Sequence, residues 1–296
     1  MITVQVVADS ISPDDKRLTT FVLTYPRFIH AEIMTHRLFS RNASSSRAIP
    51  VAKMMEAIRN NPAMPEYWGS NKPGMQAGEE LSDESPGTWD GYRTLSPREM
   101  AKGRWLAGRD HALGLAERLA EDGLHKQIAN RVLEPWMHIT VVCSATEWDN
   151  FYWLRTDAMA QPEFRILAER MLEVHNASTP VTLYPGEWHL PFVSDEEHLR
   201  IGTEKAKKAS VARTARVSYL NHDGTAPDLD KDAGLHDMLL TSGHMSPFEH
   251  QATPAPTGRA RCGNFIGFRQ YRQTVPNENR TNFSGLLRKK HVSRAL

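Results

Sequence analysis

Cysteine is scarce in this sequence: the 296 residues contain two, Cys143 and Cys262. They stand far apart and in no metal-ligand spacing, so the pattern indicates neither a disulfide framework nor a zinc knuckle. No run approaches the roughly 20 consecutive apolar residues of a membrane span. The N-terminus, MITVQVVADSISPDD, lacks the basic and apolar regions of a signal peptide. These features predict a cytoplasmic protein that does not enter a membrane.

An excess of one charge is also missing. The chain has 36 Lys plus Arg against 35 Asp plus Glu, a formal net charge of +1. General binding of nucleic acid depends on a concentrated basic excess, so this balance argues against an Arg-rich nucleic-acid module. The sequence has no glycine-rich dinucleotide fingerprint, no Walker loop and no tandem repeat.

What the sequence does contain is a dense polar stretch, MTHRLFSRNASSSRAIP, at residues 34–50. The apolar residues of the preceding FIHAEIM have helical spacing, so we expect a helix after Pro26 that carries His36 and Arg37 at its C-terminal end. The serines then follow in a loop, whose hydroxyl and N–H groups suit an anion such as a phosphate. By residue type alone, most such serines form turns and most such arginines are solvated or ion-paired.

The remaining chain alternates between expected strands, loops and helices. Two β-rich runs, ITVQVVA and RLTTFVLTY, predict a paired-strand opening. Residues 60–96 are rich in proline and glycine and are expected to form a loop or lid. Ser96 and Glu99 predict a capping box for a helix that runs to Gly123, and Thr146 with Asp149 predicts a second one. MHITVVCSA is expected to be a strand, and further helices are expected from Pro162 and from residue 204.

Several of these segments resemble one family, the flavin-dependent thymidylate synthases. THRLFSRNASSSR is similar to the family motif of arginine-histidine-arginine, seven residues and serine, here Thr35-His36-Arg37 and Ser45 with Arg47 following. ANRVLEP and DNFYWLRTDAMAQPE resemble two further family segments. TARVSYLNHDG and SGHMSPFEH resemble segments that precede the serine motif in the family but follow it here. FIGFRQYRQTVPNENR resembles a degenerate second copy of the apolar helix and basic loop.

The resemblance implies an α+β fold, with a mixed core of antiparallel strands and a helical region. It also implies a homotetramer that binds FAD at subunit interfaces. Residues 1–200 would carry the serine motif and the helical region. Residues 201–296 would match the family's amino-terminal segments, the two parts forming one catalytic domain.

The resemblance further assigns site residues by their matched positions. The expected catalytic residues are Ser45, Arg155 and His244. The substrate-binding residues are Ser45, Ser46, Arg47, Arg131 and Glu278. The flavin-binding residues are His36, Arg37, Asn150, Arg155, Ser218, His244, Ser246, Glu249 and Arg272. Because a serine without an adjacent base is a poor nucleophile, Ser45 is expected to position and polarise the pyrimidine. The Pro-containing run GHMSPFEH does not place metal ligands on one helix face, so we expect no metal.

The function that the resemblance implies is reductive methylation of dUMP to dTMP. FAD is the cofactor, and NADPH and methylenetetrahydrofolate are co-substrates. Three positions depart from the family pattern: Thr35 replaces an arginine, Ala43 an acidic residue and Met159 a histidine. They leave open a different C5 modification of a pyrimidine nucleotide, such as hydroxymethylation, or a flavin- or nucleotide-binding protein without turnover.

Overall fold

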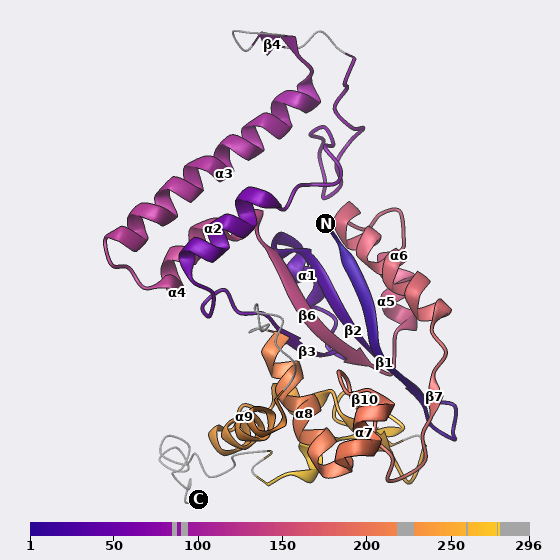
Figure 1. Ribbon diagram of the computed structural model, residues 1–296. Helices are drawn as coiled ribbons and strands as arrows, with labels where there is room; N and C mark the ends of the chain where they lie inside the picture. The colour runs from indigo at the N-terminus through magenta and orange to yellow at the C-terminus, as the bar shows by residue number, and fades with distance from the viewer. Residues whose placement is uncertain (85–87, 90–93, 218–227, 259, 277, 279–296) are drawn as a thin grey trace, which may run out of the picture.

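The computed structural model describes residues 1–84, 88–89, 94–217, 228–258, 260–276 and 278. Its centre is a five-stranded sheet with the strand order β3-β6-β2-β1-β7 (Figure 1). The strands are β1 (Thr3–Ile11), β2 (Arg17–Pro26), β3 (Ser40–Ala43), β6 (His138–Ala145) and β7 (Val181–Thr182). Strands β1, β2, β6 and β3 pair antiparallel, and β7 adds in parallel to β1. The expected α+β fold and its paired-strand opening are confirmed.

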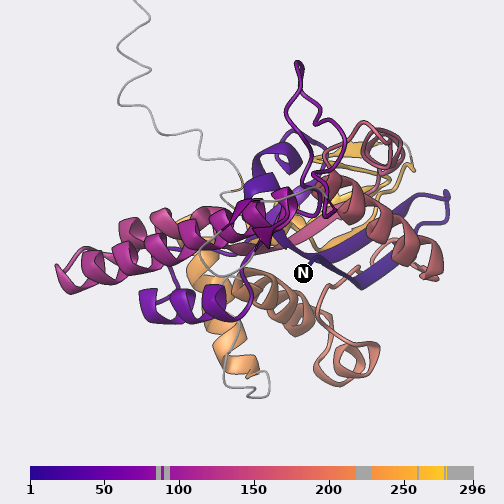
Figure 2. The ribbon, with the colours of Figure 1, turned by 90° about the horizontal axis from the view of Figure 1, so that it is seen from above.

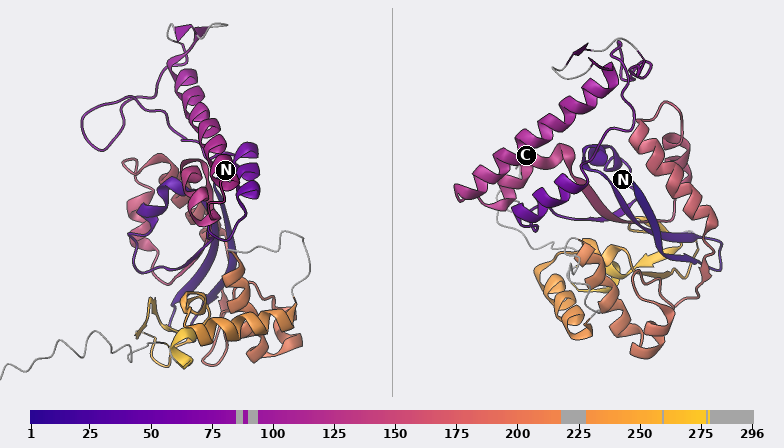
Figure 3. Two further views of the ribbon diagram at one scale, coloured as in Figure 1. Left: turned by 90° about the vertical axis from the view of Figure 1, so that its left-hand side faces the viewer. Right: turned by 45° about the horizontal axis from the view of Figure 1, so that its top comes forward.

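One face of the sheet carries the largest apolar core. Phe21, Leu23 and Tyr25 occupy every second position of β2 and belong to the same buried cluster as Phe164 and Leu167. The covering elements are η1 (Arg27–Ile29), α1 (His30–Ile33), α5 (Asp149–Arg155) and α6 (Pro162–Ala177). Seen edge-on, these helices lie on one side of the sheet (Figure 3, left). The alternation in β2 therefore explains which face is covered.

A β-bulge in β1 changes which side chains face this core. The register shifts between Val6 and Ala8, so Val6 pairs with Phe21 while Ala8 pairs with Thr20. A bulge inserts one residue and so reverses the alternation beyond it. Ser10 consequently joins the face of Thr20, opposite to the main core.

A second layer extends away from the sheet on the other side. It consists of α2 (Val51–Asn60), α3 (Pro97–Glu121), α4 (Lys126–Ala129) and η2 (Asn130–Trp136), with β4 (Thr88–Trp89) and β5 (Thr94–Leu95) beyond α3 (Figure 2). Ser96 and Glu99 form the predicted capping box at the start of α3. Met54, Ile58, Leu113 and Leu133 build a separate apolar cluster here. This layer places the start of α4 near the serines that follow β3.

The C-terminal part packs against one end of the sheet. It contains α7 (Asp195–Ile201), α8 (Thr203–Arg216), α9 (Leu229–Ser242), η4 (Ser246–Glu249), β8 (Ala252–Pro254), β9 (Arg261–Cys262), β10 (Phe265–Ile266), β11 (Phe268–Gln270) and η5 (Tyr271–Thr274). Figure 1 shows α8 and α9 below the end of β3. Asn42 in β3 donates to the Thr214 carbonyl (2.8 Å), and Gln270 donates to Ser40 (2.9 Å). Side chains of β3 thus bond directly to this part.

A buried chain of hydrogen bonds also joins the C-terminal part to the sheet, and we call it the buried relay. It runs from Ser10 to His189 (2.8 Å), on to Thr20 (2.8 Å), to Ser144 (2.6 Å) and to His250 (2.8 Å). All five side chains are buried. Because unpaired polar groups are costly in an interior, these bonds fix how the two parts meet.

Two local expectations were wrong. The Thr146 hydroxyl accepts a bond from the Ile266 N–H (2.9 Å) and does not cap a helix, and α5 begins at Asp149 without a side-chain cap. The presumed second copy of the apolar helix is instead formed by β10, β11 and η5. Gly267 separates the two strands with φ of 75°, a conformation that suits glycine and ends a regular element.

Among the described residues, no helix is both long and apolar enough to cross a membrane.

The buried relay predicts a specific pH dependence of stability. Burial lowers the pKa of His189 and of His250 to about 3, from a value near 6.5 in an unfolded chain. Between these values the unfolded chain binds protons that the folded chain does not, so the free energy of unfolding decreases as the pH falls. Each histidine contributes at most about 1.4 kcal/mol per pH unit. We expect urea unfolding between pH 7 and pH 4 to show this slope, reduced in His250→Gln.

The matched control is His111→Gln, because His111 is exposed on α3. It should keep the wild-type slope. Equal slopes in His250→Gln and wild type would show that His250 is not held neutral by burial.

Candidate functional site

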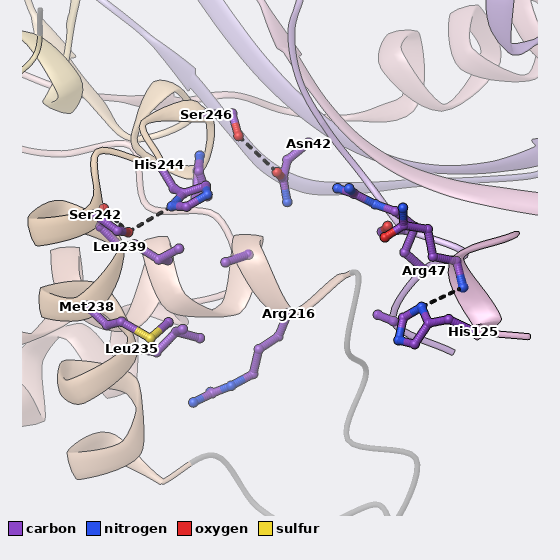
Figure 4. A pocket seen from close by; sticks show the side chains of 15 residues that line it. Asn42, Arg47, His125, Arg216, Leu235, Met238, Leu239, Ser242, His244 and Ser246 are labelled. Carbon is purple, nitrogen blue, oxygen red and sulfur yellow. Dashed lines mark hydrogen bonds between the residues drawn. The ribbon is translucent and has the colours of Figure 1, made fainter. Parts of the chain in front are cut away.

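A cavity lies where the serines after β3 meet the C-terminal helices, and we call it the main cavity (Figure 4). Its volume is about 880 Å³, within the range of roughly 300–1,000 Å³ of small-molecule sites. The residues that line it are Asn42, Ser45, Arg47, Ala48, His125, Gln127, Ala215, Arg216, Leu235, Met238, Leu239, Ser242, His244, Ser246 and Pro247. Its walls therefore come from both ends of the sequence.

The serine loop, residues 44–48, is held in place by its backbone. Ser44 forms two hydrogen bonds with Thr140 of β6. The Ser44 N–H donates to the Thr140 carbonyl (2.8 Å), and the Thr140 N–H donates to the Ser44 hydroxyl (3.1 Å). Asn130 is fully buried, and its Nδ2 donates to the carbonyls of Ser46 (2.7 Å) and Ile49 (3.0 Å). Lys126 donates to the Ala48 carbonyl (2.9 Å). These bonds occupy the carbonyls of the loop and leave the Ser45 side chain at the cavity.

The charge of the main cavity is positive. None of the fifteen lining residues, all in the described part of the chain, is acidic. Arg47 is exposed, and its guanidinium has no hydrogen bond or ion pair with any described residue. Arg216 contributes a second guanidinium. An anionic ligand would meet charge-assisted donors without a competing carboxylate on the wall.

Polar and apolar groups occupy different walls. In Figure 4, Asn42, Ser246 and His244 lie together, while Arg47 and His125 lie across from them. Ser246 donates to the Asn42 Oδ1 (3.3 Å), and Ser242 lies 2.8 Å from the His244 Nδ1. The α9 side is apolar, formed by Leu235, Met238 and Leu239. A ring system with a polar edge and an anionic group fits this combination.

A smaller, second cavity of about 480 Å³ lies beside α5. The residues that line it are Lys16, Thr35, His36, Arg37, Leu38, Phe39, Thr146, Glu147, Asp149, Asn150, Phe151 and Ile266. It contains cationic, neutral and acidic side chains. No residue lines both cavities, so His36 and Arg37 face a different space from Ser45 although they are close in sequence.

Arg155 fixes the protonation of His36. Its Nε donates to the His36 Nε2 (2.9 Å), and its guanidinium lies 4.5 Å from the centre of the Phe164 ring. Burial, together with the positive charges of Arg155 and Arg41, lowers the pKa of His36 to about 4. At neutral pH the ring is therefore neutral, with Nε2 as acceptor and the proton on Nδ1.

The structure brings some of the expected site residues together and separates others. Ser45, Arg47, His244 and Ser246 line the main cavity, whereas His36, Arg37 and Asn150 line the second cavity. Ser46 is buried, and its carbonyl accepts from Asn130. Ser218 lies outside the described residues. Arg41, which precedes the serines in sequence, donates to the carbonyls of Ile33, at the end of α1, and of His36.

Six expected site residues line neither cavity: Ser46 and Arg155, described above, and Arg131, Glu249, Arg272 and Glu278. Arg131 is 51% exposed at its side chain and pairs with Glu134 (2.6 Å). Glu249 pairs with Arg272, which also lies 3.9 Å from Glu278. Their assigned roles therefore stay predictions, and in this chain their charges are balanced by one another or by neighbours.

Three residues at the main cavity escaped the motif comparison. Asn130, next to the expected Arg131, is the one that holds the serine loop. His125 accepts a bond at Nδ1 from the Gln127 N–H (3.2 Å), which leaves Nε2 as a donor. Arg216 lies within the TARVSYL segment. The segment was recognised from the sequence, but the position of the Arg216 side chain at the main cavity was not. Only the tertiary fold shows which of two neighbouring side chains turns inward.

The described part of the chain contains no group of three or more His, Cys, Asp or Glu side chains that could hold a metal ion.

The serine loop predicts a role for Asn130 in ordering the cavity. Asn130→Ala removes both bonds to the loop carbonyls, so we expect faster amide hydrogen exchange at residues 44–49, including the Ala48 N–H that bonds Ser45 (3.0 Å). Losing buried bonds of this kind costs about 1–3 kcal/mol. The control is Asn60→Ala at the exposed end of α2. Unchanged amide hydrogen exchange in Asn130→Ala would mean that the serine loop stays ordered without its bonds to Asn130.

Comparison with known proteins gives a matching family and solved structures that are similar to this chain. Residues 12–181, more than half of the chain, match the family of thymidylate synthase complementing proteins. The match ends before α7, so the C-terminal segments lie outside it. A UMP/dUMP methylase, PolB from Streptomyces cacaoi, solved with 5-Br dUMP, has a TM-score of 0.41 and 18% identity. The match covers 60% of this chain and 90% of that one.

No curated protein matches this chain. The family match includes the serine loop, η2 and the α5 helix, which are three of the segments whose motifs resembled the flavin-dependent thymidylate synthases. This chain belongs to the thymidylate synthase complementing protein family, the family of flavin-dependent thymidylate synthases.

Proposed function

We propose that the protein is a flavin-dependent thymidylate synthase that converts dUMP to dTMP in the main cavity. The observation that carries this proposal is the meeting of Ser45 and Arg47 with His244 and Ser246 in one cavity without acidic lining residues. These residues come from segments about 200 positions apart in sequence. Together they offer an anion-binding group, hydroxyl groups and a histidine to one phosphorylated pyrimidine.

Arg47 would bind the nucleotide phosphate. Its guanidinium is free of protein partners among the described residues, so binding does not require an existing ion pair to break. Arginine offers paired donors that match phosphate geometry. The exposed position of Arg47 at the mouth of the cavity suits a group that enters from solvent with its charge leading.

Ser45 would position and polarise the pyrimidine ring. In the described residues no histidine or carboxylate hydrogen-bonds its hydroxyl, so nothing activates it as a nucleophile. The pinned loop instead holds the hydroxyl at a fixed place, where it can donate to a carbonyl oxygen of the ring as charge develops there. Neither cysteine lines the main cavity or the second cavity, which agrees with a reaction that uses no cysteine nucleophile.

The donor chemistry of the two cavities fits FAD. A flavin dinucleotide has an anionic pyrophosphate and a ring with several acceptors. Arg37 is exposed and has no described partner, and the neutral His36 keeps a donor at Nδ1. We propose that His36, Arg37 and Asn150 hold it from the second cavity and that His244 and Ser246 contact it from the main cavity. Bound flavin would supply the hydride that completes the methyl group.

NADPH and methylenetetrahydrofolate are the proposed co-substrates. The alternative is transfer of a different C5 group, and it is motivated by the departures from the family pattern. Thr35 donates to the Glu32 carbonyl (2.6 Å), so its hydroxyl is engaged by the backbone. Met159 is 68% exposed and lines neither cavity. Neither Thr35 nor Met159 can supply the positive charge of the arginine or histidine that stands at its position in the family.

Turnover tests the proposed reaction. Incubation with dUMP, FAD, methylenetetrahydrofolate and NADPH should yield a nucleotide that has gained the mass of CH2. A gain of CH2O would favour hydroxymethylation instead. If the protein binds FAD but leaves the mass of dUMP and of UMP unchanged, the non-catalytic alternative is correct.

Arg47→Gln tests the binding site. Losing a charge-assisted contact costs about 1.5–3 kcal/mol, so titration calorimetry should show dUMP binding weakened roughly tenfold or more. Arg59→Gln, an exposed substitution near the end of α2, is the control. An unchanged dissociation constant in a folded Arg47→Gln protein would remove Arg47 from the phosphate site.

A further inference from the structure

The α9 side of the main cavity has the features of a separate subsite. Arg216, at the end of α8, and Met238, on α9, both line the cavity there. In Figure 4 they lie on the opposite side from Arg47 and His125, with the cavity between. The nucleotide site proposed at the serine loop leaves this wall without a role.

Arg216 is held by a buried carboxylate. Asp232 on α9 has a side chain that is 1% exposed, and it pairs with Arg216 through Oδ1 and with Arg213 through Oδ2 (3.1 Å). Arg213 directs three further donors at Glu197 (2.6 and 2.7 Å) and the Phe192 carbonyl (2.8 Å). The two arginines thus share the Asp232 carboxylate but differ in how many N–H donors remain available for a ligand.

Arg213 directs four of its five N–H donors at described residues, whereas Arg216 directs one. Among the described residues, Arg216 directs a single N–H group at a partner, and a guanidinium carries five. Its side chain is 20% exposed, so the unused donors can reach the cavity. A fixed guanidinium with spare donors loses little side-chain entropy when it binds an anion.

The neighbouring wall is apolar and exposed. Met238 is 57% exposed, and the cavity lining on α9 also includes Leu235, three residues before it, and Leu239, the residue after it. A large exposed apolar side chain inside a cavity indicates a surface that a ligand covers. Methionine also packs well against aromatic rings.

We infer that Arg216 and the apolar face of α9 form a second subsite of the main cavity, which binds a ligand with an aromatic ring system and an anionic tail. The ring packs on Met238 and Leu239, and the tail contacts Arg216. Asp232 is a positioning residue that aims the guanidinium. The inference rests on the proposed function for the ligand's identity: a folate, with its carboxylates, and a flavin, with its phosphates, share this chemistry.

The test compares ligands across matched variants by titration calorimetry. Arg216→Gln should weaken binding of FAD or of methylenetetrahydrofolate roughly tenfold or more, while dUMP binding changes less than twofold. The ligand that is weakened identifies the occupant. Met238→Ser should weaken the same ligand several-fold, and because Met238 is exposed it should not impair folding. Arg104→Gln, exposed on α3, is the control.

A second binding experiment, with a probe unrelated to the proposed reaction, tests the subsite independently of the proposed function. Anilinonaphthalene sulfonate has an aromatic body and one anionic group, and its fluorescence reports binding. If wild type binds no dUMP, FAD or folate, the proposed function fails, and the subsite is judged by this probe. Loss of probe binding in Arg216→Gln, with retention in Arg104→Gln, would support the subsite.

The inference is overturned if Arg216→Gln leaves FAD, folate and probe binding unchanged, or if it weakens dUMP as much as the other ligands. Asp232→Asn adds a second measure. It should weaken binding of the same ligand as Arg216→Gln does. Arg216→Lys should keep part of the affinity that Arg216→Gln loses, because it keeps the positive charge. A merely structural role of Arg216 would not produce this difference.

Discussion

The main cavity depends on how the C-terminal helices are docked against the sheet. The buried relay joins side chains of β1, β2 and β6 to His189 and His250, which follow the sheet strands β1, β2, β3, β6 and β7 in sequence. Such a network holds only one alignment of the two parts, because any slip would leave buried nitrogen and hydroxyl groups without partners. The bulge in β1 is needed for this, since it turns Ser10 toward His189. Once the parts are aligned, the serine loop and α9 face each other across the cavity.

The arrangement of charge follows from the same docking. Most arginines near the cavities are committed to protein partners: Arg41 to carbonyls after α1, Arg213 to Glu197 and Asp232, and Arg272 to Glu249. Arg47 remains unpaired among the described residues, and Arg216 is only partly used. A ligand therefore meets a small number of available cations at defined places. This explains how a chain with a net charge of +1 can present arginine donors in a cavity whose lining contains no acidic residue.

Local sequence signals predicted local structure well. The β-rich runs of β1 and β2, the capping box of Ser96 and Glu99, and the proline that starts α6 all depend on neighbours in sequence. Thr146 shows where local signals fail, because its hydroxyl accepts a hydrogen bond from a backbone N–H more than 100 residues away in sequence. The site shows it again: β3 separates His36 from Ser45, so one motif serves two cavities. The pairing of Arg216 with Asp232 and of Asn130 with the serine loop are tertiary contacts that spacing alone cannot reveal.

The central claim is that one nucleotide site is assembled at the main cavity from the serine loop and the C-terminal helices. A crystal structure of the protein with dUMP tests this most directly. The account predicts a nucleotide in the main cavity, with its phosphate at Arg47 and its ring within reach of the Ser45 hydroxyl. A nucleotide bound in the second cavity beside His36 and Asn150, with the main cavity empty, would contradict it.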